Sequence, residues 1–304
     1  MHIVVIAGGS SSERDVSLRS GAAVQAALIQ AGHQATIHDP AEQPIDDALG
    51  KYDVAFPIIH GQGGEDGSLQ QQLEAIGLAY VGSGVDACRL TFNKSTYKEL
   101  LNSQGIPTPA GSLVRVDNLH NNPLVQTPFV LKPYDGGSSV DTFIVRDPAA
   151  APWQRIEQAL TDTYHEMLLE SLIEGIEITV GVVGEQALPV IEIIPPSGGE
   201  FDYENKYNGA SQELCPPQHV AAEVQQQAQQ LALQIHQLCD CQDFSRTDMI
   251  VSSDGKLIVL ETNTLPGMTN ESLLPKAAGV AGMAMPALCD RLVQLAVSRQ
   301  TGAA

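Results

Sequence analysis

The chain has 304 residues, of which 43% are hydrophobic and 17% are charged. This composition supports a sizeable core and excludes a disordered chain or a coiled coil, and the length favours two or three domains. Sixteen Lys and Arg against 36 Asp and Glu give a net charge of −20. Most of the surface would repel phosphate, which argues against nucleic-acid and membrane partners. Any phosphorylated ligand must be held by a few local cations and backbone N–H groups.

The cellular compartment is indicated by three absences. No apolar stretch approaches the roughly 20 residues that span a bilayer. Residues 1–6 run into glycines and then charge, so they resemble a first strand and not a signal peptide. The five cysteines are odd in number and lack zinc-ligand spacing, which favours reduced thiols. We therefore expect a cytoplasmic protein.

Strand and helix signals alternate over residues 1–84, as in an α/β fold. A helix is expected to begin at Asp15 or Ser17, either of which could cap it, and to end before Gly32. Apolar runs on both sides of this helix end in glycine-rich sequences, the second at 60–67. Loops at the carboxyl ends of strands are where open parallel sheets bind ligands. Neither a dinucleotide-binding G-x-G-x-x-G after the first strand nor a P-loop motif is present.

The remaining two thirds mix shorter strands with helices. We expect strands at residues 129–132, 167–170, 178–183 and 189–194. A glutamine-rich helix should begin near residue 220, with an apolar stripe at helical spacing facing a core.

A hairpin is predicted where two apolar runs are joined by an Asp-Gly pair at 254–255. A two-residue turn there places Asp248 opposite Glu261 and Arg246 opposite Asn263, with all four side chains on one face. Opposed carboxylates destabilise each other, but two carboxylates and an amide oxygen are hard ligands that suit Mg²⁺. Two alternatives remain at this point: a metal site, or a solvated face with an incidental acidic pair. A loop of odd length would break this register.

The motifs, taken together, resemble the D-alanine–D-alanine ligases of the ATP-grasp superfamily. They follow the family's order and spacing from residue 3 to about residue 292. The matching motifs are Gly8-Gly9…Glu13-Arg14-Asp15-Val16-Ser17, His60-Gly61…Gly64-Glu65-Asp66-Gly67, Tyr80-Val81-Gly82-Ser83-Gly84, Lys132-Pro133…Ser138-Ser139-Val140, Asp202-Tyr203-Glu204…Lys206-Tyr207, Arg246…Asp248, and Glu261…Asn263-Thr264…Pro266-Gly267-Met268-Thr269…Ser272-Leu273.

The resemblance implies a three-domain ATP-grasp architecture of mixed α/β and α+β class. A Rossmann-like α/β domain would span residues 1–84, a central lid domain 85–175, and a C-terminal catalytic domain 176–304. The implied activity joins two D-alanines through D-alanyl phosphate, giving the dipeptide, ADP and phosphate for peptidoglycan synthesis. ATP is the implied co-substrate, two Mg²⁺ ions (replaceable by Mn²⁺) the implied cofactors, and a homodimer the expected assembly.

The resemblance also assigns nucleotide contacts. The residues matched to phosphate are Lys94, Lys132, Ser138, Ser139 and Lys206. Those matched to the nucleoside are Glu170 and Leu172 for adenine and Glu177 for the ribose hydroxyls. Without the resemblance, these lysines and glutamates would be ordinary surface charges.

The catalytic assignments agree with the hairpin argument. Asp248, Glu261 and Asn263 match the family's Mg²⁺ ligands. Arg246 would stabilise the transferring phosphoryl group, and the Gly267 amide would complete an oxyanion site.

The amino-acid contacts come from the two ends of the chain. Glu13 matches the acid that binds the first ammonium group and is held by Ser138 and Tyr207, and His60 matches a residue that assists the first carboxylate. Ser272 and Leu273 match the pair that receives the second carboxylate. Ser272 could instead be a plain helix cap. A tyrosine at 207 favours D-alanine as the second substrate.

Four residues depart from the family pattern. Asn93 stands where Asp is usual, Asp141 where Gly is usual, and Glu271 and Lys276 where neutral residues are common. Two alternatives therefore stay open: a related ligase with a different amino acid or hydroxy acid substrate, and a non-catalytic regulator that binds nucleotide or amino acid.

Overall fold

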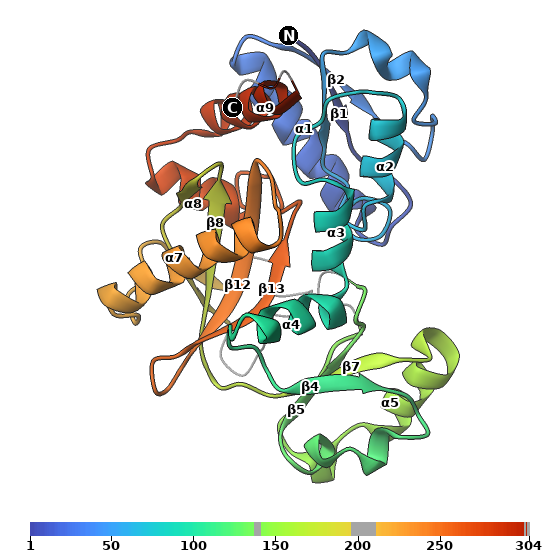
Figure 1. The fold of residues 1–304 in the computed structure, drawn as a ribbon, viewed down its shortest axis with the longest axis vertical. Coiled ribbons are helices and arrows are strands. Elements are labelled where there is room, and N and C mark those ends of the chain that lie inside the picture. Colours follow the sequence, from blue (N-terminus) through green and yellow to red (C-terminus); the bar gives the residue numbers. More distant parts are fainter. Residues whose placement is uncertain (137–140, 196–210, 301, 303–304) are drawn as a thin grey trace.

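The computed structural model describes residues 1–136, 141–195, 211–300 and 302. Three sheets lie along the long axis of the molecule, with the C-terminal sheet between the other two (Figure 1). One sheet is parallel and two are antiparallel, which confirms the mixed α/β and α+β class. Four residues with an expected role lie outside the described residues: Ser138, Ser139, Lys206 and Tyr207.

The N-terminal sheet is parallel, in the order β2-β1-β3. Its strands are β1 (His2–Ile6), β2 (Gln34–His38) and β3 (Val54–Pro57), and its helices are α1 (Arg14–Gln30) and α2 (Ser68–Ala75). Both β1 and β3 are almost fully buried, as expected for strands covered on two faces. The carboxyl ends of β1 and β3 therefore bring both glycine-rich loops to one edge of the sheet.

The start of α1 differs from the expected one. Glu13 occupies the N-cap position, and no side chain caps the helix. Ser17 lies inside α1, where its hydroxyl donates to the Ile58 carbonyl at 2.6 Å and accepts from the Gly8 amide at 2.8 Å. The cap prediction was wrong because this buried hydroxyl satisfies the ends of two strands instead. Gly32, with φ of +89°, closes the helix region as expected.

The middle sheet is antiparallel, in the order β4-β7-β5-β6. Its strands are β4 (Gly111–Val114), β5 (Phe129–Lys132), β6 (Phe143–Val145) and β7 (Met167–Ser171). One face packs under α5 (Trp153–Gln158) and a π-helical turn (Ala159–Tyr164). Side chains alternate across the sheet: Phe129 and Leu131 enter this core, while Val130 and Lys132 face the opposite side.

The C-terminal sheet has the order β11-β10-β8-β12-β13, with β9 paired to β8. Its strands are β8 (Gly175–Val183), β9 (Gln186–Ala187), β10 (Ile191–Ile194), β11 (Gln212–Leu214), β12 (Phe244–Ser252) and β13 (Leu257–Asn263). The helix α7 (Ala222–Leu238) covers one face with the predicted apolar stripe. The helix α8 (Leu273–Val280) contacts β8 from the N-terminal side of the molecule.

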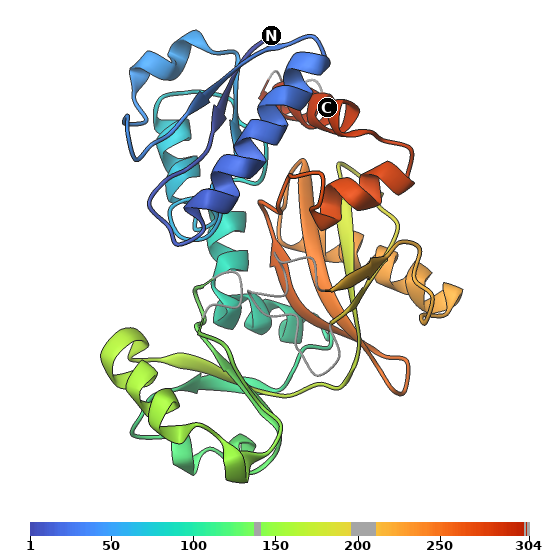
Figure 2. The same cartoon turned by 180° about the vertical axis from the view of Figure 1, so that it is seen from behind.

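Hydrophobic cores cross the expected domain ranges. The helices α3 (Val85–Phe92) and α4 (Lys94–Ser103) lead to the middle sheet, but Tyr97 and Leu101 of α4 pack with α7 and the C-terminal sheet. The helix α9 (Met285–Gln300) returns to pack against α1 in a core shared with β1 and β3 (Figure 2).

The β12–β13 hairpin has the predicted pairs but not the predicted turn. Asp248 lies opposite Glu261 and Arg246 opposite Asn263. The turn has three loop residues, because the Ser252 amide donates to the Lys256 carbonyl and Gly255 takes a φ of +79°. A β-bulge at Leu260 then restores the register, since Met249 pairs with Val259 while Asp248 pairs with Glu261. The odd loop and the extra residue offset each other.

Within the described ranges, no single helix is long and apolar enough to cross a membrane. The bent pair α8–α9 meets the length and composition criteria jointly, with a 102° break between its helices.

Candidate active site

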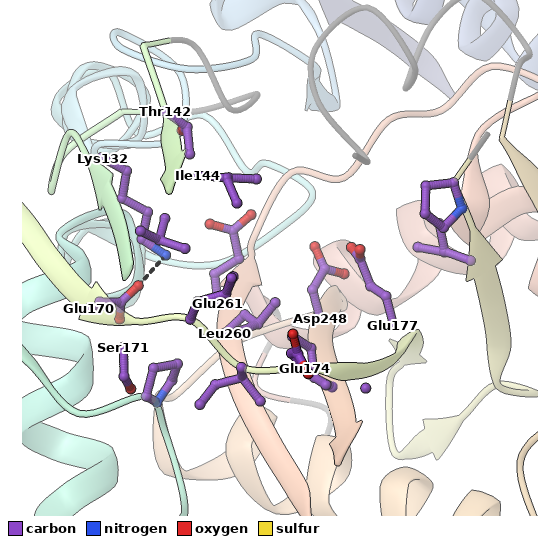
Figure 3. A pocket seen from close by; sticks show the side chains of 18 of the residues that line it. Lys132, Thr142, Ile144, Glu170, Ser171, Glu174, Glu177, Asp248, Leu260 and Glu261 are labelled. Atoms are coloured by element: carbon purple, nitrogen blue, oxygen red, sulfur yellow. Dashed lines mark ion pairs between the residues drawn. The ribbon is translucent and has the colours of Figure 1, made fainter. Parts of the chain in front are cut away.

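A cavity of about 720 Å³ lies between the middle and C-terminal sheets (Figure 3). Apolar walls face each other across it, Val130 and Ile144 from the middle sheet and Ile250 and Leu260 from the C-terminal sheet. The sequence-predicted residues on its lining are Lys94, Lys132, Glu170, Leu172, Glu177, Asp248 and Glu261. An apolar slot with charged groups at one end is suited to a planar base joined to phosphates.

Two lysines share one buried carboxylate at the middle-sheet side of this cavity. Lys132 Nζ lies 2.7 Å from Glu170 Oε2, and Lys98 Nζ lies 2.5 Å from Glu170 Oε1. Burial alone would raise the pKa of Glu170, but Lys132 and Lys98 together bring it below its usual value. The pKa of Lys132 is raised, since its attraction to Glu170 and Glu261 outweighs the effect of burial. Glu170 therefore stays ionised and fixes the position of both lysines.

The acidic hairpin faces these lysines from the other sheet. Arg246 forms a two-bonded ion pair with Asp248, Nε to Oδ1 at 2.9 Å and a terminal nitrogen to Oδ2 at 2.7 Å. Thr179 on β8 also donates to Asp248 Oδ1, at 2.5 Å. Lys94 Nζ lies 3.5 Å from Glu261 Oε2 and donates to the Gly136 carbonyl at 2.5 Å. Cations and carboxylates thus meet at one end of the cavity.

The hairpin donors fit Mg²⁺ by chemistry. Asp248 and Glu261 are directly paired, and the neighbouring Arg246–Asn263 pair adds an amide to the same end of the hairpin. Asn263 and Glu261 also line a small adjoining cavity together with Lys94. Two carboxylates and one amide oxygen supply only oxygen ligands, which Mg²⁺ prefers.

His60 and Glu13 lie at the glycine-rich edge of the N-terminal sheet. His60 is buried, and burial lowers its pKa to about 4, so the ring is neutral at pH 7. Its Nδ1 lies 3.1 Å from the Leu265 carbonyl and must carry the proton, leaving Nε2 to accept from Ser20 at 3.3 Å. Glu13 is 5% exposed, and a side chain on Gly61 would approach its carboxylate to 2.8 Å. Glycine at 61 therefore keeps room for this acid.

Glu65 is a second, half-buried acid at this edge, and no role was assigned to it. It accepts from the Gly61 amide at 2.6 Å. Burial, with a further contribution from Glu13, raises the pKa of Glu65 to about 8. Glu65 therefore keeps its proton at pH 7, so that Glu13, Glu65 and Glu261 do not all carry a charge.

Ser272 precedes α8 without capping it. Its hydroxyl bonds to the Thr269 amide at 3.1 Å and to the Thr269 hydroxyl at 2.9 Å, so the plain helix-cap alternative is wrong. A side chain on Gly267 would come within 2.8 Å of Ser272 Oγ. Among the described residues, the Ser272 side chain does not cap the amide groups at the start of α8, which include that of Leu273 and could receive an anion.

The charged departures beside this motif pair with each other. Lys276 Nζ lies 2.9 Å from Glu213 Oε2 on β11 and 3.0 Å from Glu271 Oε2. Glu271 and Lys276 therefore offset each other's charge next to Ser272.

The described residues do not place every expected group on one surface. The residues Glu13, His60, Gly267, Ser272 and Leu273 do not line the two cavities described above. Electrostatic coupling of Glu65 to Glu13, Glu261 and Arg246 links the glycine-rich edge to the hairpin. Sequence reasoning missed Lys98 and Thr179 as partners of site carboxylates. A usable signal for Lys98 was its spacing of four from Lys94, which places both on one face of a helix.

Two antiparallel sheets that enclose a cavity lined by lysines and carboxylates define the class of this protein, an ATP-grasp fold. Residues 32–83 match the family model described as D-ala D-ala ligase N-terminus, and residues 100–294 match D-ala D-ala ligase C-terminus. The D-alanine–D-alanine ligase of Nitratidesulfovibrio vulgaris is 40% identical over 98% of this chain and 99% of its own. That of Syntrophobacter fumaroxidans is 42% identical over 97% of each chain.

Solved structures agree with these relatives. One structure of the D-alanine–D-alanine ligase of Bacillus anthracis is 30% identical to this chain, with a TM-score of 0.82 over 100% of both chains. A second structure of that ligase is complexed with ATP. The ligase of Coxiella burnetii has a TM-score of 0.84 over 99% of this chain and 95% of its own, at 25% identity. The chain belongs to the D-alanine–D-alanine ligase family, which confirms the resemblance.

Proposed function

We propose that the chain is an ATP-dependent ligase that joins two molecules of D-alanine through a D-alanyl phosphate intermediate. The observation that carries this proposal is the hairpin register, which sets Asp248 against Glu261 directly across from Lys94 and Lys132. Family membership supplies the substrate class. The D-alanine–D-alanine ligases named above match this chain over nearly their full length.

In the proposed first step, a carboxylate oxygen of the first D-alanine attacks the γ-phosphorus of ATP, and ADP leaves. The apolar walls hold adenine, Glu177 accepts the ribose hydroxyls, and Lys94 and Lys132 offset phosphate charge. Mg²⁺ held by Asp248, Glu261 and Asn263 would screen the charge of the phosphates when bound. Lys206 and the serines of the 138–139 loop complete the phosphate contacts in this proposal.

In the proposed second step, the amine of the second D-alanine attacks the acyl carbon, phosphate leaves, and the attacking nitrogen loses a proton. Glu13, with Ser138 and Tyr207, holds the first ammonium group, and Arg246 with the Gly267 amide stabilises the tetrahedral oxyanion. Neutral His60 assists the first carboxylate indirectly in this proposal, because its one N–H donates to the Leu265 carbonyl and so holds the backbone next to the Gly267 amide. Ser272 and Leu273 receive the second carboxylate at the start of α8.

We extend the proposal to the cellular setting. The dipeptide product suits peptidoglycan synthesis, and use of ATP suits the cytoplasm. No disulfide joins any of the five cysteines, all of which lie in the described residues. The family resemblance supports three further parts of the proposal: domains at 1–84, 85–175 and 176–304, a homodimer, and the use of Mn²⁺ in place of Mg²⁺. The net negative charge supports the absence of nucleic-acid partners.

The first experiment measures phosphate release with ATP and Mg²⁺ across single amino acids, with mass spectrometry of the products. Release should require D-alanine and yield its homodipeptide. Release with another amino acid would support a related ligase with a shifted substrate and direct attention to Asp141, Glu271 and Lys276. Nucleotide binding without release would support the regulator.

The variant Glu261→Ala tests the metal assignment. Loss of one ligand should lower kcat by at least about 100-fold, because charge on the transferring phosphoryl group is then poorly offset. Asp254→Ala is the matched control, since Asp254 lies at the exposed turn of the same hairpin. Turnover near the wild-type rate in Glu261→Ala would remove Glu261 from the metal site.

A further inference from the structure

Lys98 is a buried lysine on α4 that the proposed function does not use. It is 5% exposed, and its ammonium group donates to the Pro109 carbonyl at 2.5 Å, the Thr108 hydroxyl at 3.2 Å and Glu170 Oε1 at 2.5 Å. Three donors meet three acceptors, so this ammonium is fully satisfied without a ligand. Burial lowers the pKa of Lys98, and attraction to Glu170 opposes this shift, so Glu170 is the partner that keeps the buried ammonium charged.

The contact joins two parts of the molecule. Lys98 belongs to the helix that packs on the C-terminal sheet, whereas Thr108 and Pro109 lead into β4 and Glu170 lies on β7 of the middle sheet. Figure 1 shows α4 next to the middle sheet, and the three hydrogen bonds of Lys98 join the two. The lysine therefore fixes one wall of the nucleotide cavity relative to the other.

Charge counting gives Lys98 a second effect. Lys98, Lys132 and Glu170 carry a net charge of +1 as a group. Lys98 is sealed, with 6% of its side chain exposed, whereas Lys132 is 15% exposed and lines the cavity. The surplus positive charge is therefore presented to the cavity through Lys132 (Figure 3).

Without Lys98 the balance changes. Among the described residues, Lys132 would then be the one cation left beside Glu170, and the pair would have zero net charge. A buried carboxylate that has lost one partner binds the remaining one more tightly, since nothing else offsets its desolvation. Lys132 would then be less available to a triphosphate.

We propose that Lys98 is a positioning residue for nucleotide binding: it is the permanent counter-ion of Glu170 and so leaves the charge of Lys132 free for the ATP phosphates. This inference rests on the proposed role of Lys132 in phosphate binding. Lys98 itself touches neither substrate nor phosphate.

The test compares Lys98→Met, Lys98→Arg and Lys132→Met, with Lys256→Met at the exposed hairpin turn as a matched charge control. Binding of a non-hydrolysable ATP analogue with Mg²⁺ is measured by calorimetry, and KM is measured for ATP and for D-alanine. Lys98→Met should weaken analogue binding and raise KM for ATP about tenfold, the effect of weakening one charge-assisted contact. KM for D-alanine and kcat should change less than about threefold, and Lys98→Arg should retain most of the affinity.

The double variant Lys98→Met/Glu170→Gln guards against a simple folding defect. It removes the two buried charges together and returns the group to a net charge of +1 on Lys132 alone. It should bind the analogue several-fold more tightly than Lys98→Met, a rescue that a purely structural role does not predict.

Two results would overturn the inference, and they differ in what they leave standing. If Lys132→Met loses affinity while Lys98→Met keeps it, Lys98 has no positioning role and the proposed phosphate contact of Lys132 survives. If Lys132→Met itself binds the analogue normally, the proposed phosphate role of Lys132 fails together with the inference. A double variant that binds no better than Lys98→Met also contradicts it.

Discussion

Asp141 holds a backbone conformation that glycine adopts at little cost. Its φ is +53°, and its carboxylate accepts from the Tyr164 hydroxyl at 2.5 Å. Glycine is usual at this place in the family, and the left-handed conformation explains that preference. The chain substitutes an acid that tolerates this region and ties it to the π-helical turn.

The variant Asp141→Gly should leave stability within about 1 kcal/mol of wild type, because relief of the left-handed strain offsets one lost surface hydrogen bond. Activity should be equal or better, since an acid beside the expected phosphate loop is removed. Urea unfolding and KM for ATP provide the measurements. Asp141→Asn is the control that removes the charge and keeps a hydrogen-bonding side chain. A severe loss of activity in both variants would assign Asp141 a direct role.

His236 on α7 makes the stability of the fold depend on pH. It is 5% exposed, lies 2.7 Å from the Ser245 hydroxyl, and has a pKa that burial lowers to about 4. The unfolded chain binds a proton at this histidine below about pH 6.5, whereas the folded chain does not until about pH 4. Its contribution to stability is therefore present above pH 6.5 and is lost as the pH falls toward 4.

The variant His236→Gln should lack this dependence. Between pH 6.5 and pH 4 the unfolding free energy of wild type should fall by roughly 2 to 3 kcal/mol more than that of the variant. Urea unfolding of both proteins at several pH values within this window measures the difference. Parallel pH profiles would show that His236 is protonated in the folded state.

At the scale of elements, the hairpin shows what alternation can and cannot predict. The apolar runs and the Asp-Gly pair were enough to place Asp248 opposite Glu261, but the turn type and the bulge were not predicted. Two registers give the same pairs at the site, one with a regular ladder and one with a longer loop plus an extra residue. Packing decides between them, and packing is not visible in a local pattern.

The bulge allows two consecutive side chains, Leu260 and Glu261, to face the cavity. Leu260→Ala should therefore raise KM for ATP about tenfold, because an apolar wall of the base slot is lost. It should leave kcat within a few-fold, because the Asp248–Glu261 pair remains. Steady-state kinetics at saturating D-alanine measures both. A large fall in kcat with unchanged KM would show that the bulge serves the carboxylates and not the base.

At the scale of the whole molecule, Arg299 of α9 fastens the segment 80–82, which lies beside β3, to Asp243 at the start of β12. Arg299 lies 2.6 Å from Asp243 Oδ1 and also donates to the Tyr80 carbonyl at 2.9 Å. The second oxygen of Asp243 accepts from the Gly82 amide at 2.7 Å. Asp243 is 7% exposed, so its charge depends on these partners.

The variant Arg299→Ala should lower the free energy of unfolding by about 2 to 4 kcal/mol, because a buried carboxylate loses its cation. Arg291→Ala, an exposed arginine on the same helix, should change it by less than about 0.5 kcal/mol. Urea midpoints with an unchanged m-value measure the effect. Equal stability of the two variants would contradict the fastening role.

Long-range partners explain what the sequence could not provide. The acidic hairpin is local and was derived from spacing, whereas Lys98 and Glu170 meet across 72 positions. Glu65 belongs to the glycine-rich motif at 60–67, but its raised pKa depends on burial and on Glu13, which the motif does not reveal. Family resemblance supplied the remaining roles, since a lone lysine or glutamate gives no local sign of its partner.

The packing of α9 on α1 has a consequence for synthesis. His33 Nε2 lies 2.9 Å from Asp290 Oδ1, although the two residues are 257 positions apart in the chain. A ribosome that adds roughly 5–20 residues per second needs tens of seconds to cover that distance. During this interval the part of α1 that packs on α9 has no partner, and a nascent chain with such an exposed face is prone to aggregation. The N-terminal sheet is thus made first, but its hydrophobic core is completed only when α9 has been synthesised.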